Sequence, residues 1–466
     1  MFILDSNKRQ PLNVKLYNQI KDQIVTGKLP PHSRLPSVRD LAGELAISRN
    51  TVEYAYEQLC TEGFIYSKAR SGYFIAALDQ EFIIRSSQTR VNSLRHMFAE
   101  EKQYTFDFHP ASLLPDSFPT AIWRKLFADC LRDNAGALTR YSEQQGEREL
   151  RGEIQRYLER SRGVICEQDQ IVICSGLHDS LAIVAQILRA EHSQLAVEEP
   201  GYWIPRSVFQ NHSFSITPVP VNVNGLDVEY LQTTSSTVVY VTPSHQFPLG
   251  YVMPVESRLR LIQWAETVNG VIIEDDYDSE LRYHGKPIPA LQGLHPAADI
   301  IYAGTFSKVL SPALRISYLV LPYPLLARYH GLFGGFPGTV SLLEQKILAR
   351  FIKDGYWERH LRKLRTIYKK KHDLLLGAIE RHFGSRASII GQGAGLHVVL
   401  ELSAHDIEEK ELILRAQAKD IRVFPFADTC LVDAGRNSRI MLGFGGMSPD
   451  KIEQGVKLLY QCCYEA

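Results

Sequence analysis

The chain has 466 residues, of which 45% are hydrophobic and 22% are charged, and its formal net charge is zero. This length exceeds what one hydrophobic core usually serves, so we expect two or more domains. The composition excludes a wholly disordered chain, and the zero net charge excludes a global field that would steer the molecule toward nucleic acid or an anionic membrane. Any such affinity must be local.

The leading residues and the cysteines predict a cytoplasmic protein. The first ten residues, MFILDSNKRQ, lack the apolar stretch and small-residue cleavage site of a secretory signal. The longest uncharged run, residues 230–255, is rich in Thr, Ser, Gln and Pro, which does not fit a membrane-spanning helix. Seven cysteines, with no pair two residues apart, indicate neither a disulfide framework nor a zinc site.

The first segment, residues 1–76, is predicted to hold three short helices and a strand pair. Apolar residues recur at helical spacing from Leu16 to Ile24, which predicts a helix that ends near Gly27. Two further helices are predicted to begin at Ser37, where SVRD matches a capping box, and at Ser48. The stretch FIYSKARSGYFIA then indicates two strands around a polar turn. Together these elements predict a winged helix-turn-helix.

This segment has a local positive charge, with ten Lys and Arg against seven Asp and Glu, or +3. From this pattern alone, a protein-interaction domain or a plain helical cap is more common than a DNA-binding domain. The third helix carries polar side chains opposite its apolar stripe, and side chains of these types can read base edges in a DNA groove. They are Arg49, Asn50, Thr51, Glu53 and Tyr54.

A resemblance supports the DNA-binding interpretation. The string RLPSVRDLAGELAISRNTVEYAYEQLCTEGFIYSKARSGYFI, residues 34–75, resembles the GntR-type winged helix of bacterial transcription regulators. The shared features are a Leu-Pro-Ser opening and an SRNTV-like start of the recognition helix. The resemblance implies that operator DNA is a partner and that its contacts are Arg34 and Arg39 around the first helix of the motif, Arg49, Asn50 and Thr51 in the recognition helix, and Lys68, Arg70 and Gly72 in the wing.

The rest of the chain is predicted to be an α/β domain. Residues 77–103 have few turn signals and are expected to be a linker, long enough at about 3.3 Å per residue to span most of a subunit. In residues 104–466, strands and helices alternate up to about residue 330, which predicts a mostly parallel sheet with helices on both faces. A smaller α+β lobe is expected to follow.

Several predicted strands end in polar residues. These segments are QIVICSGL (170–177), LAVEEPGYW (195–203), VVYVTPSHQFPLG (238–250), VIIEDDYD (271–278) and DIIYAGTFSK (299–308). Open α/β sheets bind their ligands at the carboxyl ends of the strands, so we expect these side chains to converge. The turn Ser175-Gly176-Leu177 leads from a strand into a helix and presents backbone N–H groups to an anion.

The residue types at these strand ends suit a pyridine aldehyde that carries a phosphate. Lys308 in an apolar site has a lowered pKa and can form an imine, and Asp275 can pair with a ring nitrogen. Each residue alone has an ordinary alternative, as a solvated lysine, a turn cap or a surface ion pair, so the hypothesis depends on their convergence. The proposed phosphate ligands are Arg315, Thr305, Ser307 and the Ser175-Gly176-Leu177 turn, while Tyr277 can hydrogen-bond the ring hydroxyl and Tyr202 can stack on the ring face.

A second resemblance covers nearly the whole chain. Residues 104–460 are similar to fold-type I aminotransferases, which use pyridoxal 5′-phosphate. The stretches YSEQQGERELRGEIQRYLERSRGV, VTPSHQFPLG, EDDYDSELRY and GTFSKVLSPALR resemble MocR-type regulators, which join a GntR winged helix to an aminotransferase-like domain. The resemblance implies a head-to-tail, domain-swapped homodimer and makes Lys308 the Schiff-base lysine, with the roles given above for the other cofactor residues. It also implies that Arg439 binds an effector carboxylate and that Arg206 is a second carboxylate ligand.

One departure from the aminotransferase pattern bears on turnover. Aminotransferases hold the cofactor's ring hydroxyl through the Asn of an Asn-Pro motif, whereas Phe247 precedes Pro248 here, and either His245 or Gln246 is the candidate substitute. We therefore predict a transcription regulator that senses an amino compound, or pyridoxal phosphate itself, through the cofactor Schiff base. The alternatives are an active aminotransferase with an accessory DNA-binding module and an inert domain used only for dimerisation.

Overall fold

The computed structural model describes residues 11–77, 102–283, 288–403, 407–432 and 438–465. The chain divides into two compact units, Met1–Lys102 and Gln103–Ala466, which we describe separately. The expected linker, residues 77–103, lies almost wholly outside the described residues. Within the described part of the chain, none of the helices combines the length and the apolar character needed to cross a membrane.

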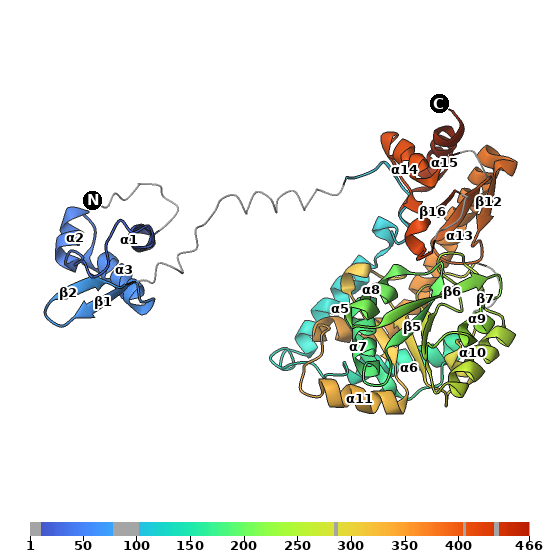
Figure 1. Cartoon of the computed structure of the whole chain (residues 1–466), viewed down its shortest axis with the longest axis horizontal. Helices are drawn as coiled ribbons and strands as arrows, with labels where there is room; N and C mark the ends of the chain where they lie inside the picture. Colours follow the sequence, from blue (N-terminus) through green and yellow to red (C-terminus); the bar gives the residue numbers. More distant parts are fainter. Residues whose placement is uncertain (1–10, 78–101, 284–287, 404–406, 433–437, 466) are drawn as a thin grey trace. The chain divides into compact units, whose positions relative to one another are not determined.

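The first unit is a three-helix bundle with a two-stranded wing (Figure 1). Ser37 and Ser48 cap the second and third helices, because their hydroxyls accept the N–H groups of Asp40 and Thr51. The predicted helix-turn-helix and wing are therefore confirmed, and Leu16, with the other apolar residues of the three helices, is buried between them. The elements are α1 (Leu12–Val25), α2 (Val38–Glu44), α3 (Arg49–Thr61), β1 (Ile65–Lys68) and β2 (Gly72–Ile75).

The second unit is built on an eight-stranded sheet with the order β4-β11-β10-β9-β8-β5-β6-β7. The central strands run parallel, as predicted, so the carboxyl ends of β5, β8, β9 and β10 meet at one edge. The strand β11 is antiparallel to both β10 and β4, and β4 therefore points the same way as β10. The strands are β4 (Ile171–Cys174), β5 (Gln194–Glu199), β6 (Ser215–Asn222), β7 (Gly225–Leu226), β8 (Val238–Val241), β9 (Val271–Asp276), β10 (Ile300–Thr305) and β11 (Ser317–Val320).

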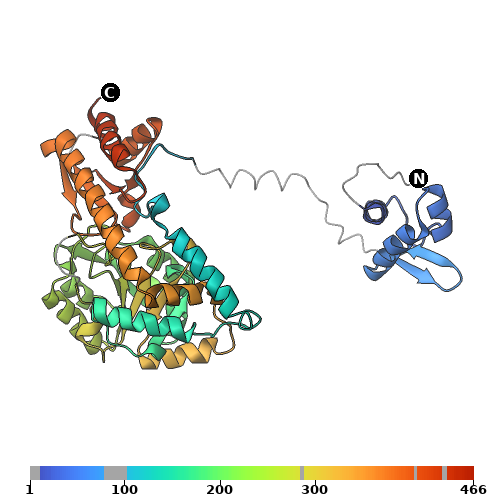
Figure 2. The same ribbon diagram turned by 180° about the vertical axis from the view of Figure 1, so that it is seen from behind.

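Helices cover both faces of this sheet (Figures 1 and 2). Alternate residues of the buried strands pack into different hydrophobic cores. On one face of the sheet, Val172 and Ile273 pack with α7, α8 and α11. On the opposite face, Ile173 packs with α5, α6, α12 and α13, and Ile272 packs with α9 and α10. This arrangement confirms the predicted α/β class. The helices are α5 (Thr120–Asp133), α6 (Arg148–Arg162), α7 (Leu177–Leu188), α8 (Trp203–Asn211), α9 (Val228–Gln232), α10 (Val255–Thr267), α11 (Tyr323–Phe333), α12 (Leu342–Lys353) and α13 (Tyr356–Phe383).

The smaller lobe of this unit is an antiparallel sheet with the order β12-β13-β16-β15, packed on helices. Helix α13 contacts both α12 of the large lobe and α15 of the small lobe, and Figure 2 shows it running from one to the other. A short strand before α5, β3 (Phe106–Asp107), pairs with β14 of this lobe. The other elements are β12 (Ala387–Ile390), β13 (His397–Leu402), α14 (Glu409–Ala418), β14 (Ile421–Arg422), β15 (Phe424–Pro425), β16 (Arg439–Gly443) and α15 (Pro449–Tyr464).

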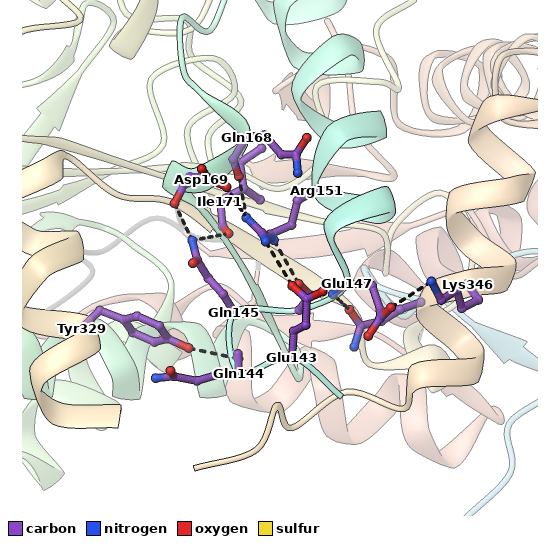
Figure 3. A network of polar contacts seen from close by, with 12 residues as sticks. Glu143, Gln144, Gln145, Glu147, Arg151, Gln168, Asp169, Ile171, Tyr329 and Lys346 are labelled. Carbon is purple, nitrogen blue, oxygen red and sulfur yellow. Dashed lines mark hydrogen bonds and ion pairs between the residues drawn. The ribbon is translucent and has the colours of Figure 1, made fainter. Parts of the chain in front are cut away.

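A polar network ties the segment before α6 to the start of β4 (Figure 3). The buried guanidinium of Arg151 donates a hydrogen bond of 2.9 Å to the carbonyl of Gly146 and pairs with Asp169 at 3.1 Å. The amide of Gln145 donates to the carbonyl of Ile171 at 2.9 Å. The network fixes the amino end of β4, and so helps to position the turn that follows its carboxyl end.

Candidate functional site

A cavity of about 270 Å³ lies where β5, β8, β9 and β10 end, beside the first turn of α7. Parallel strands place their carboxyl ends together, which is why segments more than 100 residues apart in the sequence meet there. Eight of the ten residues predicted to bind the cofactor line this cavity. They are Lys308, Asp275, Tyr277, Tyr202, Leu177, Thr305, Ser307 and Arg315.

An amine and a carboxyl group share this cavity, and burial moves their pKa values in opposite directions. Burial lowers the pKa of Lys308, against the opposing charges of Asp278 and Asp275. Burial raises the pKa of Asp275 to about 7, although the hydroxyl of Tyr240 donates a hydrogen bond to its Oδ2. The lowered pKa makes a larger fraction of the Lys308 amine neutral, and a cationic partner would favour the ionised form of Asp275.

At the other end of the cavity, an arginine lies against the start of a helix. Arg315 adopts a left-handed conformation, and its Nη2 donates to the carbonyl of Ser175 at 3.3 Å. A Cβ atom on Gly176 would lie 2.2 Å from that Nη2, so a larger residue would displace the guanidinium. The N–H of Ser175 donates to Asp179 at 2.8 Å and is not free for a ligand. In the rest of the predicted turn, the backbone N–H groups from Gly176 onward start a helix, and the first N–H groups of a helix have no intrahelical acceptor.

The cavity has an aromatic wall. The rings of Tyr202 and Phe247 both line it and meet edge to face, with their centroids 5.2 Å apart. Burial raises the pKa of Tyr202 to about 12, so this phenol stays neutral.

Of the two candidate substitutes for the missing Asn, Gln246 donates to the carbonyl of Pro200 at 2.9 Å. The Nδ1 of His245, by contrast, lies 3.0 Å from the hydroxyl of Tyr277, which does line the cavity.

The two arginines predicted to bind an effector carboxylate are not brought to the cavity wall. The Nη2 of Arg439 pairs with Glu401 at 2.6 Å, because the antiparallel register of β13 and β16 sets these two residues opposite each other. Arg206 donates to the carbonyl of Asp428. Neither arginine is among the described residues that line the cavity. The guanidinium of Arg439 also lies over the ring of Phe426, 5.2 Å from its centroid.

The predicted DNA contacts are spread over four neighbouring parts of the first unit. Ser48 caps α3, so the three predicted recognition residues form its first turn, where their side chains reach solvent. Arg34 lies beside the wing, since its backbone bridges to Phe74 and its Nε would be 3.5 Å from a Cβ on Gly72. The exposed or half-buried candidates are Arg34 before α2, Arg39 in α2, Arg49, Asn50 and Thr51 in α3, and Lys68, Arg70 and Gly72 in the wing.

Sequence reasoning missed three residues that act on the lining side chains. Tyr240 hydrogen-bonds Asp275 from the neighbouring strand, and Asp278 contacts His245. The short spacing within EDDYD was a signal for Asp278, whereas Tyr240 looks like an ordinary buried strand residue. Glu198, which accepts the hydroxyl of Thr242 at 2.6 Å, was also missed.

Two family models match the chain. Residues 12–75 match the family described as bacterial regulatory proteins, gntR family, and residues 114–459 match aminotransferase class I and II. The second match covers most of the chain, so the protein contains a class I and II aminotransferase domain joined to a GntR-type DNA-binding domain. A GntR domain implies binding to operator DNA, and the aminotransferase fold implies dependence on pyridoxal phosphate.

Relatives that match over most of the chain are named as transcription regulators. The chain is 38% identical to the uncharacterized HTH-type transcriptional regulator YdeL of Bacillus subtilis (strain 168), over 96% of each chain. It is 32% identical to the probable rhizopine catabolism regulatory protein MocR of Rhizobium meliloti, over 98% of this chain and 95% of the relative. It is 31% identical to the pyridoxine biosynthesis transcriptional regulator PdxR of Corynebacterium glutamicum, over 84% of each chain. The chain therefore belongs to the MocR-type transcription regulators of the GntR family.

Solved aminotransferase structures share the fold of the second unit. The α-aminoadipate aminotransferase LysN from Thermus thermophilus matches with a TM-score of 0.68 and 24% identity, over 77% of this chain and 92% of that one. The kynurenine aminotransferase of Pyrococcus horikoshii matches with a TM-score of 0.70 and 24% identity, over 83% of this chain and 96% of that one. At this identity the likeness establishes the fold.

Proposed function

We propose that this transcription regulator holds pyridoxal 5′-phosphate on Lys308 and senses an amino compound at that site. The observation that carries the proposal is the single cavity in which Lys308, Asp275 and Arg315 face one ligand space from separate elements. A buried amine, a buried carboxyl and an anion-binding helix start are the three groups that a phosphorylated pyridine aldehyde requires.

The anion-binding end of the cavity fits a phosphate group. Gly176 leaves room for Arg315 against the first turn of α7, and a guanidinium beside helix N–H groups is a strong site for a phosphate dianion. The hydroxyls of Thr305 and Ser307, 3.1 Å apart, supply further donors at the same end. A phosphate bound there would fix the ligand's position relative to Lys308.

The reacting end fits the aldehyde and the ring. Pyridoxal phosphate supplies an electrophilic carbon and an electron-withdrawing ring when it is bound. Lys308 presents an amine whose pKa is lowered, so a larger fraction of it is neutral and nucleophilic near neutral pH. Asp275 would hold a proton on a ring nitrogen, and the ring of Tyr202 would cover one face and exclude water.

The site suits a sensor because an effector amine could take the place of the Lys308 amine on the cofactor. An effector amine that takes the place of the Lys308 amine frees that side chain, and a ligand that favours one packing of the two lobes shifts the population toward it. Arg439 remains the proposed ligand for the effector carboxylate, which would have to replace Glu401. We further propose a homodimer with domain-swapped winged helices that bind two half-sites.

The test is operator binding by the full-length chain. Fluorescence anisotropy would measure the Kd for a labelled fragment from the upstream region of the chain's own gene, with and without pyridoxal phosphate and across a panel of amino acids and amines. The Kd should respond to cofactor and effector in the wild type and in Lys125→Ala, an exposed lysine of α5, but not in Lys308→Ala. Equal responses in all three proteins would refute the proposal. Sustained conversion of an amino acid and a keto acid would instead favour an aminotransferase.

A further inference from the structure

Three side chains form a chain of contacts that leads into the cavity. Tyr277 follows β9 and lines the cavity, and its hydroxyl lies 3.0 Å from Nδ1 of His245. The same Nδ1 lies 3.0 Å from both carboxyl oxygens of Asp278. His245 and Asp278 are almost fully buried, with 4% and 2% of their surface exposed, so water does not substitute for these contacts.

The carboxylate selects one tautomer of His245. A bare Nδ1 lone pair would face two carboxylate oxygens and be repelled, whereas an Nδ1–H group donates to them. The other ring nitrogen, Nε2, is buried and has no hydrogen-bond partner among the described residues, so a proton on it would be a buried donor without an acceptor. The neutral imidazole with its proton on Nδ1 satisfies both conditions.

This tautomer decides what the hydroxyl of Tyr277 can do. Because Nδ1 carries a proton, it has no lone pair to accept the tyrosine's hydrogen, and the tyrosine oxygen instead receives a share of the Nδ1–H. No other hydrogen bond from this hydroxyl is made to a described residue, and Tyr277 is only half-buried because it faces the cavity. Its proton is therefore left pointing at the ligand space.

We propose that His245 and Asp278 are positioning residues that hold Tyr277 as a hydrogen-bond donor to an anionic ring oxygen of the ligand, the 3-oxygen of a hydroxypyridine. The proposal deepens the proposed function and depends on it. It also accounts for Phe247, which stands where an aminotransferase has an amide donor and has no polar atom to offer. In this chain the proposed donor to the ring oxygen is Tyr277, whose hydroxyl is oriented by His245 and Asp278.

Other groups around Tyr277 affect the pKa of its hydroxyl and not the direction in which that hydroxyl donates its hydrogen. Burial most strongly disfavours its phenolate, so its pKa lies well above the ordinary value, and four carboxyl groups add to this effect: Asp278, Asp275, Glu198 and Asp276. Tyr277 therefore keeps its proton at neutral pH, as a donor must. Across the cluster, His397 is buried beside His245, and burial lowers the pKa of His397 to about 4, so it stays neutral.

The test follows the visible absorbance of full-length protein loaded with pyridoxal phosphate as the pH is varied. A donor to the ring oxygen stabilises its anionic form, so losing the donor should raise the pKa of the chromophore by about one unit. Tyr277→Phe and His245→Ala should both show this rise, and the double variant should match Tyr277→Phe. His245→Asn can keep an N–H near the place of Nδ1 and should stay close to the wild type.

His192→Asn is the control, because His192 lies before the amino end of β5, where its Nδ1 meets Thr237. Thermal unfolding and cofactor Kd, measured on the same samples, separate a folding defect from a repositioned donor. A chromophore with the wild-type pKa in His245→Ala, or a rise in His245→Ala that adds to that of Tyr277→Phe, would overturn the inference alone. A wild-type protein that forms no chromophore would overturn the proposed function as well.

Discussion

Replacing Asp275 by Asn should stabilise the cofactor-free protein while weakening its hold on the cofactor. The carboxyl group is buried at the end of β9, and burial raises its pKa from 3.8 to about 7. Asn keeps an oxygen that can accept the hydroxyl of Tyr240 but never ionises. The substitution therefore removes the cost of a buried charge and leaves the local packing nearly unchanged.

The pH dependence of this effect has a definite sign. Because the pKa of Asp275 is raised in the folded protein, its favourable contribution is fully present below about pH 4 and is lost as the pH rises through about 7. Between pH 5 and the folded pKa, two units at about 1.4 kcal/mol each correspond to roughly 2 to 3 kcal/mol. The stability advantage of Asp275→Asn over the wild type should grow by about that amount between about pH 5 and about pH 8.

Urea unfolding of cofactor-free protein, followed by tryptophan fluorescence, measures this difference. All four tryptophans lie in Gln103–Ala466, so the signal reports on the unit that contains the site. Asp116→Asn, at an exposed carboxylate, is the control and should change the unfolding midpoint at neither pH. An advantage for Asp275→Asn that is the same at both pH values would show that burial of the charge is not the cause.

Three further variants test separate parts of the molecule. Arg315→Ala should weaken pyridoxal phosphate binding about ten- to a hundredfold, because it removes a charge-assisted hydrogen bond to phosphate, and a fluorescence titration that finds an unchanged Kd would contradict the phosphate site. Arg151→Ala should lower the free energy of unfolding by about 2 to 4 kcal/mol, because the buried carbonyl of Gly146 and the carboxylate of Asp169 both lose their partner. Urea unfolding measures this change, and a loss under about 0.5 kcal/mol would mean that the network does not stabilise the fold. Arg49→Ala should weaken operator binding about tenfold in anisotropy titrations at fixed salt, and equal affinity would remove this residue from the interface.

The features that sequence predicted best are those with local causes. The starts of the helices capped by Ser37 and Ser48 could be predicted because each serine side chain caps the backbone N–H group three residues later. The buried strands could be predicted from short apolar runs bounded by polar turns. The convergence at the cavity followed from one general rule, that parallel strands present their carboxyl ends together. The sequence alone therefore predicts that Lys308 and Asp275 lie near each other.

The features that sequence did not predict depend on register and on contacts between distant segments. The pairing of Arg439 with Glu401 arises from the register of β13 against β16, which neither strand specifies alone. The antiparallel insertion of β11 between β4 and β10 is likewise a matter of topology. The contact between His245 and Asp278 spans 33 residues and depends on how the loop after β8 folds back onto the end of β9.

The central claim is that pyridoxal phosphate bonds covalently to Lys308. Borohydride reduction of reconstituted full-length protein, followed by peptide mass spectrometry, tests it most directly. The account predicts a stable phosphopyridoxyl adduct on the peptide that contains Lys308, and no adduct on the corresponding peptide of Lys308→Ala protein treated in the same way. Wild-type protein with no adduct, or with its adduct on another lysine, would contradict the account.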